Sequence, residues 1–209
     1  VPYEIVTIER EDLPEVGLEG AGNGSAASVY VEADPSVPSH LNCELHEAPS
    51  GVLAAMAEEI VGIEGPVHVD EVVARIRTAW GLKRAGARIQ LAVENAIAGP
   101  VRAGRLVRSG DFLSVPGRIP MVRDRSDVAS ATLRKIDNLP PEELERAILD
   151  IVSANYGATA DQVCLAVSRA LGFKSTSAQL RTAIDGVVEA AVAKDWLGRR
   201  DELLVAGDA

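Results

Sequence analysis

Aromatic residues make up only 3% of this sequence, although 47% of its 209 residues are hydrophobic. The chain can therefore bury a core, but that core has to be aliphatic and rich in alanine. Such a composition favours helices over a large sheet. The shortage of aromatic side chains also argues against a stacking track for single-stranded nucleic acid.

Cysteine and long apolar runs are scarce as well. Cys43 and Cys164 lie far apart in the sequence and form no Cys-x-x-Cys motif, so we expect a reducing compartment and no disulfide framework. No stretch approaches the ~18 apolar residues that span a bilayer, and the first residues lack the features of a secretory signal. Because the chain starts at Val1 and not at methionine, we expect a fragment of a longer protein. The isolated cysteines favour a cytoplasmic location, and the lack of long apolar runs predicts no membrane partner.

Motifs of the common enzyme classes are also absent. The sequence has no G-x-x-x-x-G-K-[ST], G-x-S-x-G, H-E-x-x-H or G-x-G-x-x-G, the patterns typical of nucleotide, acyl-transfer, zinc and dinucleotide sites. His40, Cys43 and His46 have a spacing that zinc could use, but the fourth ligand is not obvious, and we interpret them as a polar loop. We expect no metal, no cofactor and no enzymatic activity.

Charge is distributed unevenly along the chain. Residues 1–64 hold thirteen acidic residues and one basic residue, residues 65–138 hold thirteen basic and seven acidic residues, and residues 139–209 hold seven basic and eleven acidic residues. The whole chain has a net charge of −10. Since salt limits charge interactions to a Debye length of ~8 Å, the basic middle third can still attract a polyanion locally.

The sequence contains an internal repeat. Residues 51–115 align with residues 142–206 without a gap, and fourteen of the 65 aligned pairs are identical. Each copy has three stretches with helical spacing of apolar residues followed by two short alternating stretches around a turn signal. The third helix contains "WGLKRAGARIQLAVENAI" in the first copy and "LGFKSTSAQLRTAIDGVV" in the second.

Three helices followed by a hairpin are typical of a winged helix-turn-helix. We predict a mostly α (α+β) fold with tandem winged helix-turn-helix-like units and short β-hairpin wings. The predicted boundaries are an acidic, partly ordered lead at 1–49, unit one at 50–116, a linker at 117–139 and unit two at 140–209. In the lead, "YEIVTI" and "SVYVEA" resemble edge strands around a mobile "LEGAGNGSAAS", and in the linker "RIPMV" and "TLRKI" are candidate strands.

Local signals predict several helix ends. Thr159 and Gln162 have the spacing of a capping box, and His68 occupies the equivalent position in unit one. Gly81 and Gly172 are expected to end the second helix of each unit in the left-handed conformation. Gly99-Pro100 predicts a kink or an early stop in the third helix of unit one, because proline cannot donate to the carbonyl of Ala96.

A basic surface on unit one is the candidate site. Its third helix places Arg84, Arg88, Leu91 and Asn95 outside the buried stripe, with Lys83 in the preceding turn, Arg75 and Arg77 on the second helix, and Arg105 and Arg108 on the wing. Arginine and lysine at these positions would neutralise phosphates and release counterions. The candidate nucleic-acid-binding residues are Arg77, Lys83, Arg84, Arg88, Asn95, Arg105 and Arg108. The matching stripe in unit two, Ser175, Gln179, Thr182 and Gly186, is nearly neutral.

One family resemblance adds to this interpretation. "EGPVHVDEVVARIRTAWGLKRAGARIQLAVENAI" followed by "SGDFL" resembles a C-terminal domain of unknown function in bacterial DNA helicase-related proteins of superfamily I, over roughly residues 45–206. The resemblance implies an accessory region that works with DNA and with the helicase motor of the same parent chain. The leading hypothesis is a non-catalytic nucleic-acid-binding module. The alternatives are a solvated or self-paired basic face and a protein-protein interaction adaptor with no nucleic-acid binding.

Overall fold

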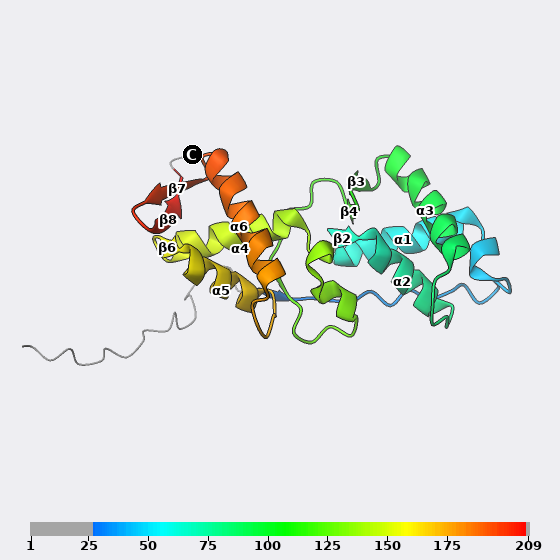
Figure 1. Ribbon diagram of the computed structural model, residues 1–209. Coiled ribbons are helices and arrows are strands. Elements are labelled where there is room, and N and C mark those ends of the chain that lie inside the picture. The colour runs from blue at the N-terminus through cyan, green and yellow to red at the C-terminus, as the bar shows by residue number, and fades with distance from the viewer. Residues whose placement is uncertain (1–26, 208–209) are drawn as a thin grey trace, which may run out of the picture.

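The computed structural model describes residues 27–207, and its two halves contain the same elements in the same order (Figure 1). The first half contains α1 (Ser50–Glu64), β2 (Val67–His68), α2 (Val69–Ala79), α3 (Ala87–Arg102), β3 (Val107–Ser109) and β4 (Phe112–Ser114). The second half contains α4 (Pro141–Ala154), β6 (Ala158–Thr159), α5 (Ala160–Ala170), α6 (Ala178–Ala193), β7 (Leu197–Arg200) and β8 (Leu203–Ala206). The protein is therefore a mixed α+β structure, about half helical, with small sheets.

The structural repeat has the same offset as the sequence repeat. Adding 91 to the residue numbers of β2, α2 and α3 gives the bounds of β6, α5 and α6. The sheets also match, with strand order β2-β4-β3 in unit one and β6-β8-β7 in unit two, all antiparallel. The same offset relates two short 3-10 helices, η1 (Leu45–Glu47) and η3 (Ile136–Asn138), so the structural repeat begins earlier than the sequence alignment does.

Each unit is built on its own aliphatic core. In unit one Ile60, Val72, Val93 and Leu113 are fully buried, and Ala33, Leu45 and Ala48 from the lead join the same cluster. The corresponding cluster of unit two includes Ile148, Val163, Ile184 and Leu204. A smaller cluster of Tyr30, Val128 and Leu133 brings the lead and the linker together.

The observed structure of the lead and the linker differs from the strands predicted in these two segments. β1 (Ser28–Val29) pairs in parallel with β5 (Arg123–Asp124), so only two residues of "SVYVEA" form a strand, and "YEIVTI" lies outside the described residues, as does most of "LEGAGNGSAAS". The linker strands predicted at "RIPMV" and "TLRKI" are wrong. Pro120 interrupts the first of them, and residues 131–134 form the 3-10 helix η2 (Ala131–Arg134) instead.

Several predicted helix ends are confirmed. Gly81 and Gly172 have φ angles of 69° and 81°, and the Thr159–Gln162 capping box is present in full. His68 caps α2 through its Nδ1, which accepts the backbone N–H of Asp70 at 3.2 Å. The predicted early stop of α3 is wrong, because α3 runs through Pro100 and has the same 16 residues as α6. Pro100 lies in the last turn of α3, two residues before its end.

Removal of the Thr159 hydroxyl tests the capping box. Thr159→Ala should lower the free energy of unfolding by about 1 kcal/mol, since one of the free N–H groups of α5 loses its acceptor. Urea denaturation followed by circular dichroism would measure the change. Thr182→Ala is the matched control, because its hydroxyl only donates back to the Ala178 carbonyl within α6; an equal loss in both variants would contradict the capping role.

Candidate nucleic-acid interface

The helix α3 has one buried and one exposed face. Val93, Ala96 and Ile97 are at most 2% exposed and pack into the unit-one core, as their three- and four-residue spacing predicts. The opposite face, which includes Arg88, Leu91 and Asn95, is exposed along the helix. The sequence between α2 and α3, residues 81–86, is also exposed throughout, so the turn and the outer face of α3 form one accessible surface.

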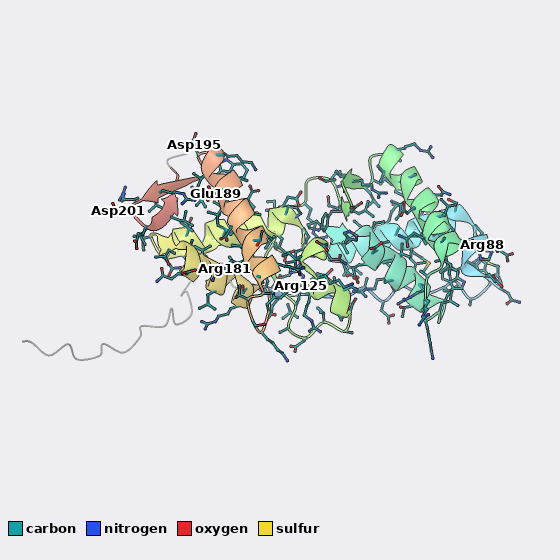
Figure 2. The ribbon with its side chains drawn as sticks, in the orientation of Figure 1. Arg88, Arg125, Arg181, Glu189, Asp195 and Asp201 are labelled. Carbon is teal, nitrogen blue, oxygen red and sulfur yellow. The ribbon has the colours of Figure 1, made fainter. Side chains whose placement is uncertain are left out.

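Three cations lie on this surface without an acidic partner. Among residues 27–207, no salt bridge involves Lys83, Arg84 or Arg88. Figure 2 places Arg88 at the end of unit one that is remote from unit two. Arg77 is held differently, since its guanidinium donates to the Lys83 carbonyl at 3.1 Å and thereby ties α2 to the turn.

Arg102 belongs to the same exposed face and was not among the predicted residues. It lies 14 residues after Arg88 on α3, is exposed, and forms no salt bridge within the described part of the chain. Fourteen residues are close to four full helical turns, so the periodicity of the sequence could have identified it. We name the set Lys83, Arg84, Arg88, Leu91, Asn95 and Arg102 the α3 face.

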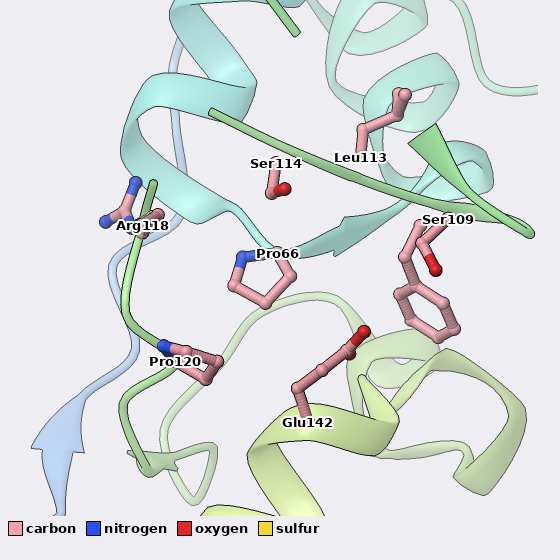
Figure 3. A pocket seen from close by; sticks show the side chains of 8 residues that line it. Pro66, Ser109, Leu113, Ser114, Arg118, Pro120 and Glu142 are labelled. Atoms are coloured by element: carbon pink, nitrogen blue, oxygen red, sulfur yellow. The ribbon is translucent and has the colours of Figure 1, made fainter. Parts of the chain in front are cut away.

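The predicted wing residues do not join the α3 face. Arg105 forms a two-pronged ion pair with Glu58 of α1, with both N–O distances at 2.9 Å, which neutralises its charge. Arg108 donates to the carbonyl of Gly110 in its own hairpin and lies 3.9 Å from Asp111. Ser109 and Phe112, on either side of the turn between β3 and β4, line a cleft together with Glu142 of α4 (Figure 3).

This cleft is too small for a typical organic ligand. Its volume is about 120 Å³, below the roughly 300 Å³ at which ligand pockets begin. Arg118 also lines it, but its guanidinium donates to the carbonyls of Gly62 and Ile63 at the end of α1. No cluster of three possible metal ligands occurs within residues 27–207. Within the same range, none of the helices has the length and hydropathy needed to span a bilayer.

Arg75 is not a surface cation, contrary to prediction. Its guanidinium donates to both carboxylate oxygens of Glu64, at 2.8 and 3.1 Å, and lies 2.8 Å from Glu32. Its side chain is only 12% exposed, and Glu71 adds a third carboxylate at 3.7 Å. The sequence could not show this, because Glu32 and Glu64 are distant from Arg75 along the chain.

A second buried charge cluster joins the two units. Glu143 at the start of α4 accepts hydrogen bonds from the guanidinium groups of Arg123 and Arg125, at 2.6 to 3.2 Å. Arg123 also donates to the carbonyls of Glu64 and Pro66 in unit one. The Tyr30 ring lies under both guanidinium groups, 4.7 and 4.9 Å from its centre, and Figure 2 shows Arg125 between the units.

The electrostatics of this junction favour its charged form. Burial alone would raise the pKa of Glu143, but the hydrogen bonds and charges of Arg125 and Arg123 outweigh burial and lower the pKa below its ordinary value. Burial and the Glu64 carboxylate raise the pKa of Tyr30, whose hydroxyl donates to Glu64 at 2.8 Å. The junction is therefore a buried ionic network that connects the two units, in which Nε of Arg125 has no hydrogen-bond partner among the described residues.

The equivalent turn of unit two is covered by the linker. The backbone N–H of Arg125 donates to the Leu171 carbonyl at 3.1 Å, and a Cβ added to Gly172 would overlap Asp124 and the backbone nitrogen of Ser126. A Cβ added to Gly81 of unit one would meet nothing within 4 Å. The two copies therefore differ in access as well as in charge.

The outer face of α6 is nearly neutral. Ser175, Gln179, Thr182 and Gly186 replace Arg84, Arg88, Leu91 and Asn95 under the 91-residue offset. Arg181 on the same helix pairs with Asp161 of α5. The α3 face of unit one is consequently the cationic member of the pair.

Comparison with known proteins gives one partial match. Residues 43–91 match the model of a family described as a protein of unknown function (DUF3320). This match covers η1, α1, α2 and the first turns of α3, and it supports an uncharacterised domain. No curated protein matches, and no solved structure matches.

Proposed function

We propose that this chain is a non-catalytic nucleic-acid-binding module that contacts phosphates through the α3 face of unit one. Each unit would be a winged helix-turn-helix, with α2 and α3 as the helix pair and β3 and β4 as the wing. The family resemblance of the sequence suggests that the module serves a DNA helicase-related parent protein and works beside its motor region.

The observation that carries this proposal is the difference between the two equivalent turns. Lys83, Arg84 and Arg88 surround an open turn at Gly81, whereas Gly172 lies under the linker. Unpaired cations on an accessible helix end attract phosphates, and each phosphate contact releases counterions. The ion pair of Arg105 with Glu58 removes one wing residue from the expected contacts, so the helix and the turn supply most of the charge.

Salt dependence of duplex binding tests the proposal. Contacts from Lys83, Arg84, Arg88 and Arg102 to four phosphates would give a slope of log K against log salt of about −3.6. Reversal of two of these charges in Arg84→Glu/Arg88→Glu should reduce the slope by about 1.8 and abolish binding above about 50 mM salt. Fluorescence anisotropy of a labelled random-sequence duplex, with the full chain, would measure both quantities.

The repeat supplies a matched control. Lys83 and Lys174 occupy the same position in the two units, and both are exposed, so Lys83→Glu and Lys174→Glu change the total charge equally. Only Lys83→Glu should weaken binding strongly. An equal loss in both variants would show that only total charge matters. Absence of binding at low salt would instead favour a protein-interaction adaptor.

A further inference from the structure

Two residues in the middle of the α3 face are not explained by phosphate binding. Leu91 is 62% exposed, and Asn95 is exposed, with no side-chain hydrogen bond within the described range. At 100° per residue, Arg88, Leu91, Asn95 and Arg102 fall within a sector of about 60° on the helix. A surface that only binds phosphates would gain nothing from an apolar side chain or an amide at its centre.

The order of the α3-face side chains along the helix suggests which kind of molecule they contact. Arg84 lies in the turn before α3 and Arg88 in its first turn, Arg102 lies in the last turn, and Leu91 and Asn95 lie between them. The sixteen residues of α3 span about 24 Å at 1.5 Å per residue, and the major groove of B-form DNA is about 12 Å wide. Cations at both ends of such a helix would face the phosphates on either side of the groove.

We propose that the α3 face reads base edges in the major groove of duplex DNA. Leu91 would contact the methyl group of thymine, and the Asn95 amide would pair with N7 and N6 of adenine. This inference rests on the proposed nucleic-acid binding and adds to it a substrate class, B-form DNA with a preferred sequence.

Unit two lacks these chemical groups at the equivalent positions. Thr182 replaces Leu91, and its hydroxyl donates to the Ala178 carbonyl within α6. Gly186 replaces Asn95 and has no side chain. Single exposed leucines are common on protein surfaces, so the argument depends on the position of Leu91 between a guanidinium and an amide on one cationic face.

Selection from a pool of random DNA duplexes at low salt tests the inference, with the full chain as bait. The pool should yield an enriched site that contains thymine and adenine. Synthesis of that site with uracil in place of thymine should weaken binding about fourfold for each lost methyl contact. Leu91→Ala should bind the uracil and thymine duplexes equally. Asn95→Ala should reduce the preference for the enriched site over a scrambled duplex by about five- to hundredfold.

The controls separate this inference from the proposed function. Thr182→Ala, at the position equivalent to Leu91, should keep the full response to uracil, and thermal melting should show that both exposed-site variants remain folded. Salt-dependent binding without an enriched sequence would overturn base reading and leave phosphate binding intact. An enriched site whose affinity is unaffected by Leu91→Ala and Asn95→Ala would also overturn it. Failure of every duplex to bind would overturn both proposals.

Discussion

Glu143→Gln should lower the free energy of unfolding by about 3 to 5 kcal/mol, the usual cost of removing one partner from a buried ion pair. Glu143 and Arg125 are each 1% exposed, so the change would leave two guanidinium groups facing a neutral amide in a buried site. The amide would also direct an N–H group toward other donors. Urea denaturation of both proteins, followed by circular dichroism, would measure the difference.

Glu142→Gln is the matched control for this change. Glu142 is the neighbouring residue in the first turn of α4, is exposed, and has no ion pair within the described residues. Both glutamates benefit from the helix dipole by at most about 1 kcal/mol, so that contribution cancels in the comparison. Equal losses in the two variants would show that the buried network adds nothing to stability.

The direction of the Glu143 pKa shift also predicts how stability depends on pH. Its pKa in the folded protein is lowered from the ordinary value of 4.5. The unfolded chain therefore binds the proton first, and the contribution to stability is complete above pH 4.5 and lost as the pH falls through the lower folded-state pKa. Glu143→Gln removes this component, so its stability should fall less steeply than that of the natural protein between about pH 5 and pH 3.

Gly172→Ala should lower the free energy of unfolding by about 2 to 5 kcal/mol. About 1 to 2 kcal/mol comes from a side chain in the left-handed conformation, at a φ of 81°. A further 1 to 3 kcal/mol is typical of overpacking, because the added Cβ would overlap Asp124 and Ser126 and lie 2.7 Å from the nitrogen of Arg125. Displacement of the linker would also break the hydrogen bond from Arg125 to Leu171.

Gly81→Ala separates the cost of the left-handed backbone conformation from the cost of overpacking. Its φ of 69° imposes a similar backbone cost, but its Cβ would meet open space. We expect a loss of only about 1 to 2 kcal/mol, measured by the same urea denaturation. Should Gly81→Ala cost as much as Gly172→Ala, the linker would not be packed against the α5–α6 turn as described here.

Local signals in the sequence predicted the helices and their ends well. The gapless repeat predicted the order and spacing of six helices along the chain. The glycines and the Thr159 capping box were predictable because each depends only on residues close to it in the sequence. The same logic failed at Pro100: proline removes the hydrogen bond to the Ala96 carbonyl, but α3 continues for two further residues. The linker was harder to predict, since its conformation depends on pairing with β1 and on contact with α5.

The candidate site was predictable only in part. Helical periodicity correctly identified the exposure of Arg88 and Asn95, which depends only on which side of α3 is buried. The placement of Arg84 on this helix was wrong, because α3 begins at Ala87 and Arg84 lies in the turn before it. The ion pairs of Arg75 and Arg105 join residues that are 11 and 47 positions apart, and charge counting along the chain cannot find them. The buried Glu143 was missed for the same reason, because its partners Arg123 and Arg125 lie 20 and 18 positions away along the chain.

The segment from Ala27 to Ala33 has a mechanical consequence. Ala27 packs on the core of unit two, Ala33 lies in the core of unit one, and Tyr30 lies against the arginines between them. This segment and the Glu143 network hold the two units together, with the cations of the α3 face at one end of the molecule. A movement of α6 would therefore also move Arg88 and the rest of the α3 face.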